Sequence, residues 1–187
     1  GYIGHNHRLP LSAFQKRRLT PDEISLTLSR TIKLLRNQNP NLKVCLTVSP
    51  VRHLRDGLHA HNLSNATLLL AADQLASACH DVSYFPAYEL LLDELRDYRF
   101  FADDLAHPSE QAIEFIWSKF RDTHFDASTR NALDELESIL GMLSHRPQHV
   151  DTKRYQEFKA TLLAKINSLS QTLPRAARLK ARYDLLP

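Results

Sequence analysis

The alternation of hydrophobic and polar residues along the chain predicts helices that are separated by two short strands. A helix is expected from residue 21 to the polar stretch at 37–40, because Thr20, Pro21 and Glu23 have the pattern of a capping box. Residues 42–48 are nearly continuously apolar and β-branched, which is typical of a strand that is buried on both faces of a parallel sheet. A second short strand is expected at 82–85, where a proline ends it.

Further helices are expected at about residues 63–78, 87–95 and 108–121, after a polar loop that runs from the first strand to Asn62. Helices of crossover length thus alternate with strands, and this order predicts an α/β fold with parallel strands. Two strands do not make a stable parallel sheet that helices cover on both faces. Partner strands are therefore expected from outside this chain or from segments that the pattern misassigns.

From residue 126 onward the pattern is helical throughout. Asp126 or Ser128 is expected to cap one helix, and Asp151 is expected to open the next. We therefore predict two parts: an α/β portion at residues 1–125 and a helical hairpin at residues 126–187, which packs on the domain or on a partner.

Composition adds few constraints. The 187 residues are 43% hydrophobic and 24% charged, as in an ordinary soluble globular protein. The net charge of +3 is small and the basic residues are spread out, so no nucleic-acid partner is expected. No apolar stretch is long enough to span a bilayer, and no signal-peptide pattern is present. Two cysteines are too few for a disulfide framework, and Cys45 is expected to pack as a small hydrophobe, which favours a cytoplasmic location.

The segment at 103–109 carries the first candidate chemistry. Asp104 stands three residues before His107, so its carboxylate can reach one ring nitrogen and fix the tautomer that presents the other nitrogen to a substrate. Pro108 favours the first position of a helix, which predicts that His107 lies immediately before that helix. The alternative is a solvated loop whose aspartate caps the helix.

A second group of candidates follows the first strand. Arg52 and His53 lie just beyond its end, and ligands of open α/β sheets bind at the carboxyl ends of strands. Either they contact the substrate or its oxyanion, or they anchor the loop. Ser49 is followed by a proline, which favours a structural role. The histidine pairs at residues 5 and 7 and at residues 59 and 61 lack Cys or carboxylate neighbours at ligand spacing, so neither a metal nor another cofactor is expected.

Three stretches together carry a family resemblance. Residues 46–57 (Leu-Thr-Val-Ser-Pro-Val-Arg-His-Leu-Arg-Asp-Gly), residues 84–89 (Tyr-Phe-Pro-Ala-Tyr-Glu) and residues 93–108 resemble the GSCFA domain family, and the match covers roughly residues 4–124. That family is similar to the SGNH (GDSL-like) hydrolases, flavodoxin-like α/β esterases whose last sequence block is Asp-x-x-His, commonly followed by Pro. The resemblance implies a flavodoxin-like parallel sheet flanked by helices.

The resemblance also implies a serine nucleophile, with His107 as its general base and Asp104 as the residue that orients His107. Asp103 is the second choice for the orienting carboxylate. The substrate would be a carbohydrate or lipid O-acyl ester or another small-molecule ester. An O-acyltransferase of the same chemistry and a non-catalytic binding or scaffold protein are the alternatives.

The chain departs from the family where the nucleophile is expected. The Gly-Ser-Cys-Phe-Ala motif is absent, as is the glycine block that would supply an oxyanion donor, and Gly4-His5-Asn6 only faintly resembles the Gly-x-Asn block of SGNH enzymes. The chain begins at Gly1 without an initiator Met. Both observations indicate the carboxyl-terminal half of such a domain, which would pack with its missing half or form a homo-oligomer. The remaining glycines, Gly57 and Gly141, are isolated, so no other segment of this chain can supply the glycine block.

Overall fold

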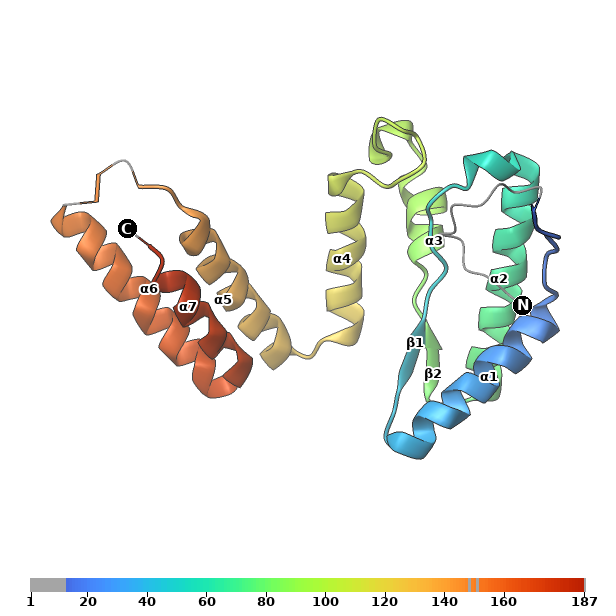
Figure 1. Ribbon diagram of the computed structural model, residues 1–187, viewed down its shortest axis with the longest axis horizontal. Helices are drawn as coiled ribbons and strands as arrows, with labels where there is room; N and C mark the ends of the chain where they lie inside the picture. Colours follow the sequence, from blue (N-terminus) through green and yellow to red (C-terminus); the bar gives the residue numbers. More distant parts are fainter. Residues whose placement is uncertain (1–12, 148, 151, 187) are drawn as a thin grey trace. The chain divides into compact units, whose positions relative to one another are not determined.

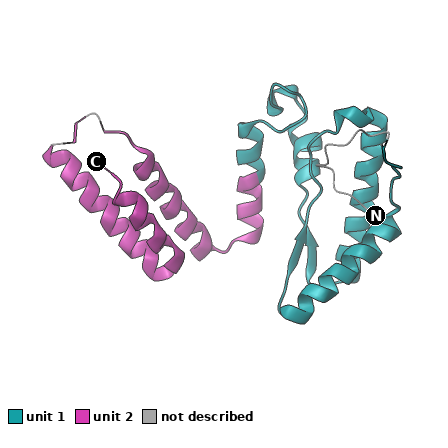
Figure 2. Ribbon diagram, in the orientation of Figure 1, with its two compact units in different colours: residues 1–116 teal, residues 117–187 magenta. Residues whose placement is uncertain are grey.

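The computed structural model describes residues 13–147, 149, 150 and 152–186 (Figure 1). The chain divides into two compact units, unit 1 at Gly1–Ile116 and unit 2 at Trp117–Pro187 (Figure 2). The division falls within helix α4 (Glu110–His124), whereas the sequence pattern places the change of character at residue 126. The described residues are mostly helical, with a small parallel sheet in unit 1. This is the mixed α/β composition that the sequence predicts.

Strands β1 (Val44–Leu46) and β2 (Val82–Tyr84) form the sheet of unit 1. They pair in parallel, with Val44 opposite Val82 and Leu46 opposite Tyr84. Helix α2 (Leu58–Ala78) makes the crossover between them, after a short 3₁₀ helix, η2 (Leu54–Asp56). The predicted parallel pairing is confirmed.

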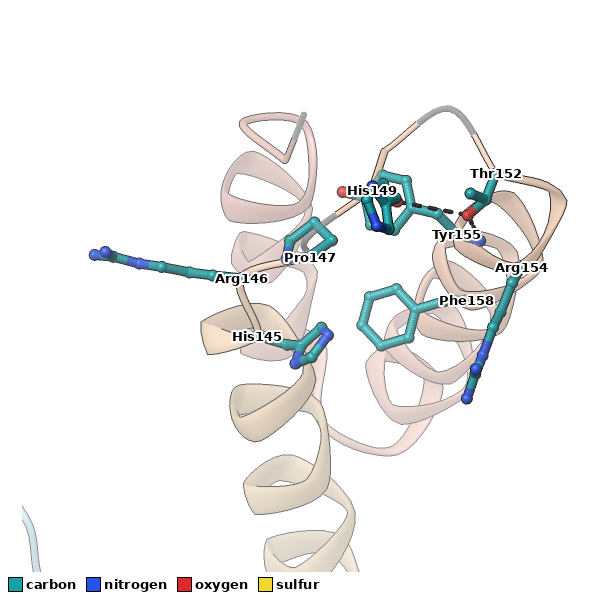
Figure 3. Close-up of a pocket in the computed structure, with 8 residues that line it drawn as sticks. All are labelled: His145, Arg146, Pro147, His149, Thr152, Arg154, Tyr155 and Phe158. Carbon is teal, nitrogen blue, oxygen red and sulfur yellow. Dashed lines mark hydrogen bonds between the residues drawn. The ribbon is translucent and has the colours of Figure 1, made fainter.

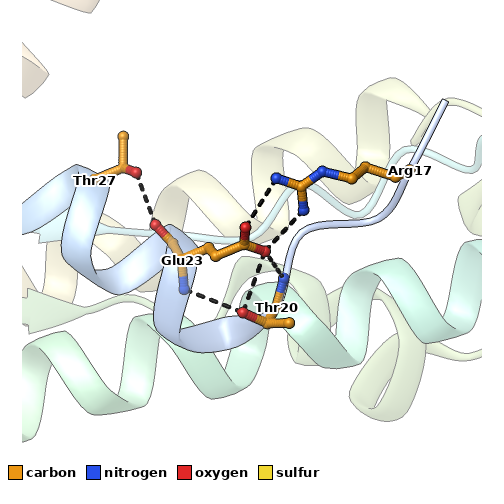
Figure 4. Close-up of polar contacts among 4 residues, drawn as sticks. All are labelled: Arg17, Thr20, Glu23 and Thr27. Atoms are coloured by element: carbon orange, nitrogen blue, oxygen red, sulfur yellow. Dashed lines mark hydrogen bonds and ion pairs between the residues drawn. The ribbon is translucent and has the colours of Figure 1, made fainter. Parts of the chain in front are cut away.

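Helix α1 (Pro21–Gln38) begins with the predicted capping box. The Glu23 N–H donates to Thr20 Oγ1 at 3.2 Å, and the Glu23 carboxylate accepts the Thr20 N–H at 2.9 Å (Figure 4). Arg17 donates two hydrogen bonds to the same carboxylate, at 2.8 and 2.9 Å. The Arg17 bonds and the Thr20 N–H hold the pKa of Glu23 at about 2. The carboxylate is therefore ionised, which also suits the positive end of the helix dipole.

One face of the sheet is covered, and this differs from the expected strand buried on both faces. Ile32 of α1 and Leu75 of α2 pack against Val82, together with other apolar side chains of the same face. Because successive strand residues point to opposite faces, Cys45 and Ser83 point to the other face, and both are exposed. The expectation that Cys45 packs as a buried hydrophobe was therefore wrong.

The predicted apolar stripe of α1 is largely outside the core. Ile32 is the buried member, whereas Leu34 and Leu35 are 67% and 52% exposed. Two three-residue strands offer too small a surface to cover the apolar faces of both helices. Leu68 and Leu70 of α2 are exposed for the same reason.

Two helix starts also differ from the prediction. Helix α2 begins at Leu58, within the segment expected to be a loop, because Gly57 adopts a positive φ of 79° and turns the chain directly into the helix. Helix α4 begins at Glu110 and not at Pro108, because Pro108 forms an isolated antiparallel bridge with Phe101. Ser109 Oγ accepts the Ala112 N–H at 3.3 Å and caps the helix instead.

The segment between β2 and α4 contains three short helical pieces. The helix expected at 87–95 is present as α3 (Ala87–Glu89), which continues into a π-helical turn, η3 (Leu90–Leu95). A 3₁₀ turn, η4 (Tyr98–Phe100), follows. Leu91, Phe101 and Ala112 form a small buried cluster under this segment, which joins it to the start of α4.

Unit 2 contains the predicted helical pair, α5 (Ala127–Ser144) and α6 (Lys153–Thr172), followed by η5 (Pro174–Arg178) and α7 (Leu179–Tyr183). The Asp126 carboxylate accepts the Thr129 N–H at 2.7 Å, as predicted for the α5 cap. Thr152 caps α6; Asp151, the predicted start, lies outside the described residues. The core of unit 2 comprises Ile139, Leu143, Leu162, Ile166, Leu169 and Ala176. None of the helices in the described ranges is long and apolar enough to cross a membrane.

Candidate active site at the Asp104–His107 loop

The loop that carries Asp104 and His107 is closed at its base by backbone hydrogen bonds. The Ala102 N–H donates to the His107 carbonyl at 2.8 Å, and the Ser109 N–H donates to the Phe100 carbonyl at 2.9 Å. The loop connects η4 to α4 and lies next to the amino-terminal end of α4 in Figure 1. Phe101, next to this base, belongs to the buried cluster with Leu91 and Ala112. Local pairing and a buried anchor therefore fix the loop on unit 1.

Asp104 holds both the backbone and the ring of His107. Its Oδ1 accepts the N–H groups of Ala106 and His107, each at 2.9 Å, and its Oδ2 lies 2.5 Å from His107 Nδ1. The backbone N–H of His107, its ring and the N–H of Ala106 lower the pKa of Asp104 to about 2. The predicted contact between Asp104 and His107 is present, and the Asp104 carboxylate is ionised at neutral pH.

The His107 ring is oriented but accessible. Its side chain is 62% exposed and that of Asp104 is 50% exposed. Because Asp104 engages Nδ1, the ring nitrogen that remains for a proton transfer is Nε2. Pro108 and Ser109 separate His107 from the first residue of α4, so the prediction that His107 immediately precedes the helix was wrong.

Arg52, in the irregular segment that follows β1, supports the loop. Its N–H donates to the Ala106 carbonyl at 3.0 Å, and its guanidinium donates to the Leu105 carbonyl at 3.2 Å. The guanidinium carbon also lies 3.8 Å from the centre of the Phe101 ring, a cation–π distance. These contacts have the form of a loop anchor, one of the two roles that the sequence left open; a substrate contact stays a prediction.

The anchor matters because Leu105 is strained. Its φ is +56°, in the left-handed region that a non-glycine residue adopts at a cost of about 1–2 kcal/mol. Both Leu105 and Ala106 offer their carbonyls to Arg52, and the Ala106 side chain is buried. Interactions from a segment about fifty residues earlier in the chain thus help to hold the strained turn between Asp104 and His107.

His53 lies beside Arg52, with its ring exposed. Its backbone N–H donates to Nδ1 of His61 at 3.4 Å, and the two rings are 5.9 Å apart. His61 and Asn65 are buried on the first turns of α2. Sequence reasoning considered His61 only as a possible metal-ligand partner of His59, and it missed Asn65. Their four-residue spacing was the available signal, and the expected loop up to Asn62 concealed it.

The other candidate groups have different surroundings. Ser49 Oγ accepts the Val51 N–H at 3.3 Å in a turn, consistent with a structural role. His59 is exposed whereas His61 is buried, so this pair does not face one space. Within the described ranges, no three His, Cys, Asp or Glu residues gather where they could hold a metal. Residues 4–7, with the histidine pair and the Gly-x-Asn-like block, lie outside the described residues.

Unit 2 contains a separate open pocket of about 630 Å³ between the end of α5 and the start of α6 (Figure 3). Aromatic rings of Tyr155 and Phe158 form one wall. Figure 3 shows Arg146 and Arg154 extending in different directions, so the two guanidinium groups do not converge on a common ligand position. The predicted site residues do not line this pocket.

These observations define a mixed α/β unit with an Asp-x-x-His loop, followed by a helical unit. The sequence model of the GSCFA family matches residues 2–120, and that of the GSCFA domain protein, C-terminal domain, matches residues 136–183. The first match covers more than half of the chain, and the chain therefore belongs to the GSCFA family. No curated protein and no solved structure matches the chain.

Proposed function

We propose that this chain supplies the general base and the orienting carboxylate of a serine hydrolase of the SGNH type, which cleaves a carbohydrate or lipid O-acyl ester. The observation that carries the proposal is the 2.5 Å contact between Asp104 Oδ2 and His107 Nδ1. A hydroxyl is a poor nucleophile until a positioned imidazole accepts its proton, and a buried or well-bonded carboxylate is the usual partner of such an imidazole.

The chemistry follows from the two ring nitrogens. Nε2 of His107 accepts the proton of the serine hydroxyl while the serine oxygen attacks the acyl carbon. The imidazolium then donates this proton to the leaving alcohol, and a water molecule, activated in the same way, releases the acid and regenerates the serine. Asp104 remains ionised throughout because its pKa is about 2, and it stabilises the imidazolium.

A flavodoxin-like sheet is part of the proposal. The parallel β1–β2 pair with α2 as its crossover is the repeating unit of such folds. The exposed side of the sheet, with Cys45 and Ser83, and the exposed leucines of α1 are surfaces that further strands and helices would cover. The nucleophilic serine would come with them.

Hydrolysis and acyl transfer would use the same serine, base and orienting carboxylate and differ in the acceptor of the acyl group. Transfer to an alcohol requires that water be excluded from the acyl-enzyme. The non-catalytic alternative is distinguished by the absence of turnover on any ester.

The test is hydrolysis of a series of aryl and sugar acetyl esters by the natural full-length protein. His107→Ala is expected to lower kcat by about 10³-fold or more, because it removes the proton acceptor. Asp104→Asn is expected to lower kcat more than Asp103→Asn, its matched neighbour. If Asp104→Asn leaves activity equal to that of the parent, the assigned pair is wrong.

A further inference from the structure

His61 and Asn65 are polar residues with unusually complete burial, each 4% exposed. Both lie near the amino-terminal end of α2, four residues apart on one face of the helix. A buried polar group is costly unless it is hydrogen-bonded, so their partners indicate why they are inside. The partners lead from α2 to the candidate active site.

The contacts of His61 define its tautomer. Nδ1 lies 3.4 Å from the His53 backbone nitrogen, whose N–H can only donate, so Nδ1 is the acceptor. A neutral imidazole then carries its proton on Nε2, which lies 2.9 Å from the Asn65 amide. The amide atom at this distance is Asn65 Nδ2, which is itself a donor. A 180° turn of the amide would bring its oxygen to the same position, where it would accept the hydrogen bond from Nε2–H. With the amide in that orientation both ring nitrogens have hydrogen-bond partners.

Protonation would disrupt this arrangement. Burial lowers the pKa of His61, and the nearby His53 and Arg52 lower it further, while Asp56 opposes them. A charged imidazolium would place an N–H donor at Nδ1, opposite the N–H donor of His53. The neutral ring is thus the form that the site requires.

A short series of hydrogen bonds connects this ring to the loop. His61 holds the backbone at His53, and the adjoining Arg52 N–H and guanidinium hold the Ala106 and Leu105 carbonyls. The Ala106 and His107 N–H groups bind Asp104, which binds the His107 ring. Each step is either a direct hydrogen bond or the peptide link between neighbouring residues. A displacement of the backbone at residue 53 can therefore be transmitted to residues 104–107.

We propose that His61 is a positioning residue: its Nδ1 fixes the backbone at residues 52 and 53, and thereby sets Arg52 against the Asp104–His107 loop. The effect on turnover rests on the proposed function, whereas the effect on loop order does not. The predicted substrate residue Arg52 then acts as the link between α2 and the loop.

Three substitutions at His61 distinguish the loss of the hydrogen-bond acceptor at Nδ1 from the loss of ring volume. Asn places its amide oxygen near the position of Nδ1, Gln places its amide near the position of Nε2, and Phe keeps a ring without nitrogen. His59→Phe, an exposed histidine on the same helix, is the matched control. The first measurement is amide hydrogen exchange by NMR on the full chain, read at Arg52, His53 and Ala102.

We expect His61→Phe to accelerate exchange at these three amides by about 10-fold or more, because a local opening becomes easier. His61→Asn should retain protection, and His61→Gln should lose it. Exchange within the second half of α2, at Ala71 and Leu75, should change little. Equal acceleration there would indicate a general loss of packing and would overturn the proposal, as would unchanged exchange at Arg52 and His53.

Should His61→Phe fail to fold, the comparison of His61→Asn with His61→Gln decides, since both are polar and differ in where the acceptor lies. In the natural full-length protein, ester hydrolysis supplies the second measurement. His61→Gln is expected to lower kcat about 10-fold with little change in KM, and His61→Asn is expected to restore it. If His61→Gln loses loop protection relative to the parent while the parent itself hydrolyses no ester, the positioning role is supported and only the proposed function is contradicted.

Discussion

The two units bury their hydrophobic residues to different extents. In unit 2, Ile139, Leu162 and Ile166 are fully buried between paired helices, and η5 and α7 close the cluster. In the described part of unit 1, two small separate clusters account for only some of the buried apolar residues, and leucines of α1 and α2 remain exposed. Paired helices can enclose a core by themselves, whereas a two-stranded parallel sheet cannot.

The difference shows how the candidate site is stabilised. Its loop does not rest on a large core; it rests on backbone pairing, on the Phe101 cluster and on polar contacts from Arg52. Such contacts are directional and specify one geometry, which a site for proton transfer requires. Unit 2 has the larger core and carries none of the predicted site residues.

The largest expected effect is on the core of unit 2. Leu162→Ala, at a fully buried position, is expected to lower the free energy of unfolding of unit 2 by about 2–5 kcal/mol, because it leaves a cavity. Leu34→Ala in α1, at a position 67% exposed, should change stability by no more than about 0.5 kcal/mol. Urea titration followed by amide signals of each unit measures both. The titration is made on the 187-residue chain; a comparable loss for Leu34→Ala there would mean that the outer face of α1 is covered within this chain, and the contrast between the units would fail.

Helix caps provide a smaller and more even comparison. Thr20 in unit 1 and Thr152 in unit 2 each accept a backbone N–H at 3.2 Å. Replacing either by Ala is expected to cost about 1 kcal/mol of helix stability, measured as faster amide exchange in the first turn. Thr20→Ala should have the larger effect because the Thr20 hydroxyl donates to the ionised Glu23 carboxylate at 3.3 Å, whereas the Thr152 hydroxyl donates to the neutral His149 carbonyl at 3.5 Å. Larger loss at Thr152 would show that the capping box adds nothing to α1.

The smallest expected effect is the loss of the stabilising contribution of Asp104 at low pH. The folded pKa of Asp104 is about 2, below its usual 3.8, so its stabilising contribution is complete above the usual value and is lost as the pH falls toward 2. The hydrogen bonds of Asp126 likewise lower its pKa. We expect amide shifts of residues 106 and 107 to titrate in this range, and Asp104→Asn to abolish that step while the Thr129 amide still titrates. A titration at 106 and 107 that survives Asp104→Asn would contradict the assigned contacts.

Features that depend on neighbours in the sequence were predictable. The capping box of α1, the Asp126 cap of α5 and the Asp104–His107 contact each join residues three apart, so local geometry suffices to form them. The parallel pairing of the strands followed from the intervening helix.

Features that join distant segments were not predictable in the same way. The exposure of Cys45 depends on which side of the sheet α1 and α2 occupy, and the start of α4 depends on the bridge between Phe101 and Pro108. The sequence by itself determined an aspartate poised to orient a histidine. The tertiary structure decided that Arg52 and, behind it, the buried His61 support that pair, because such contacts exist only after segments tens of residues apart have packed together.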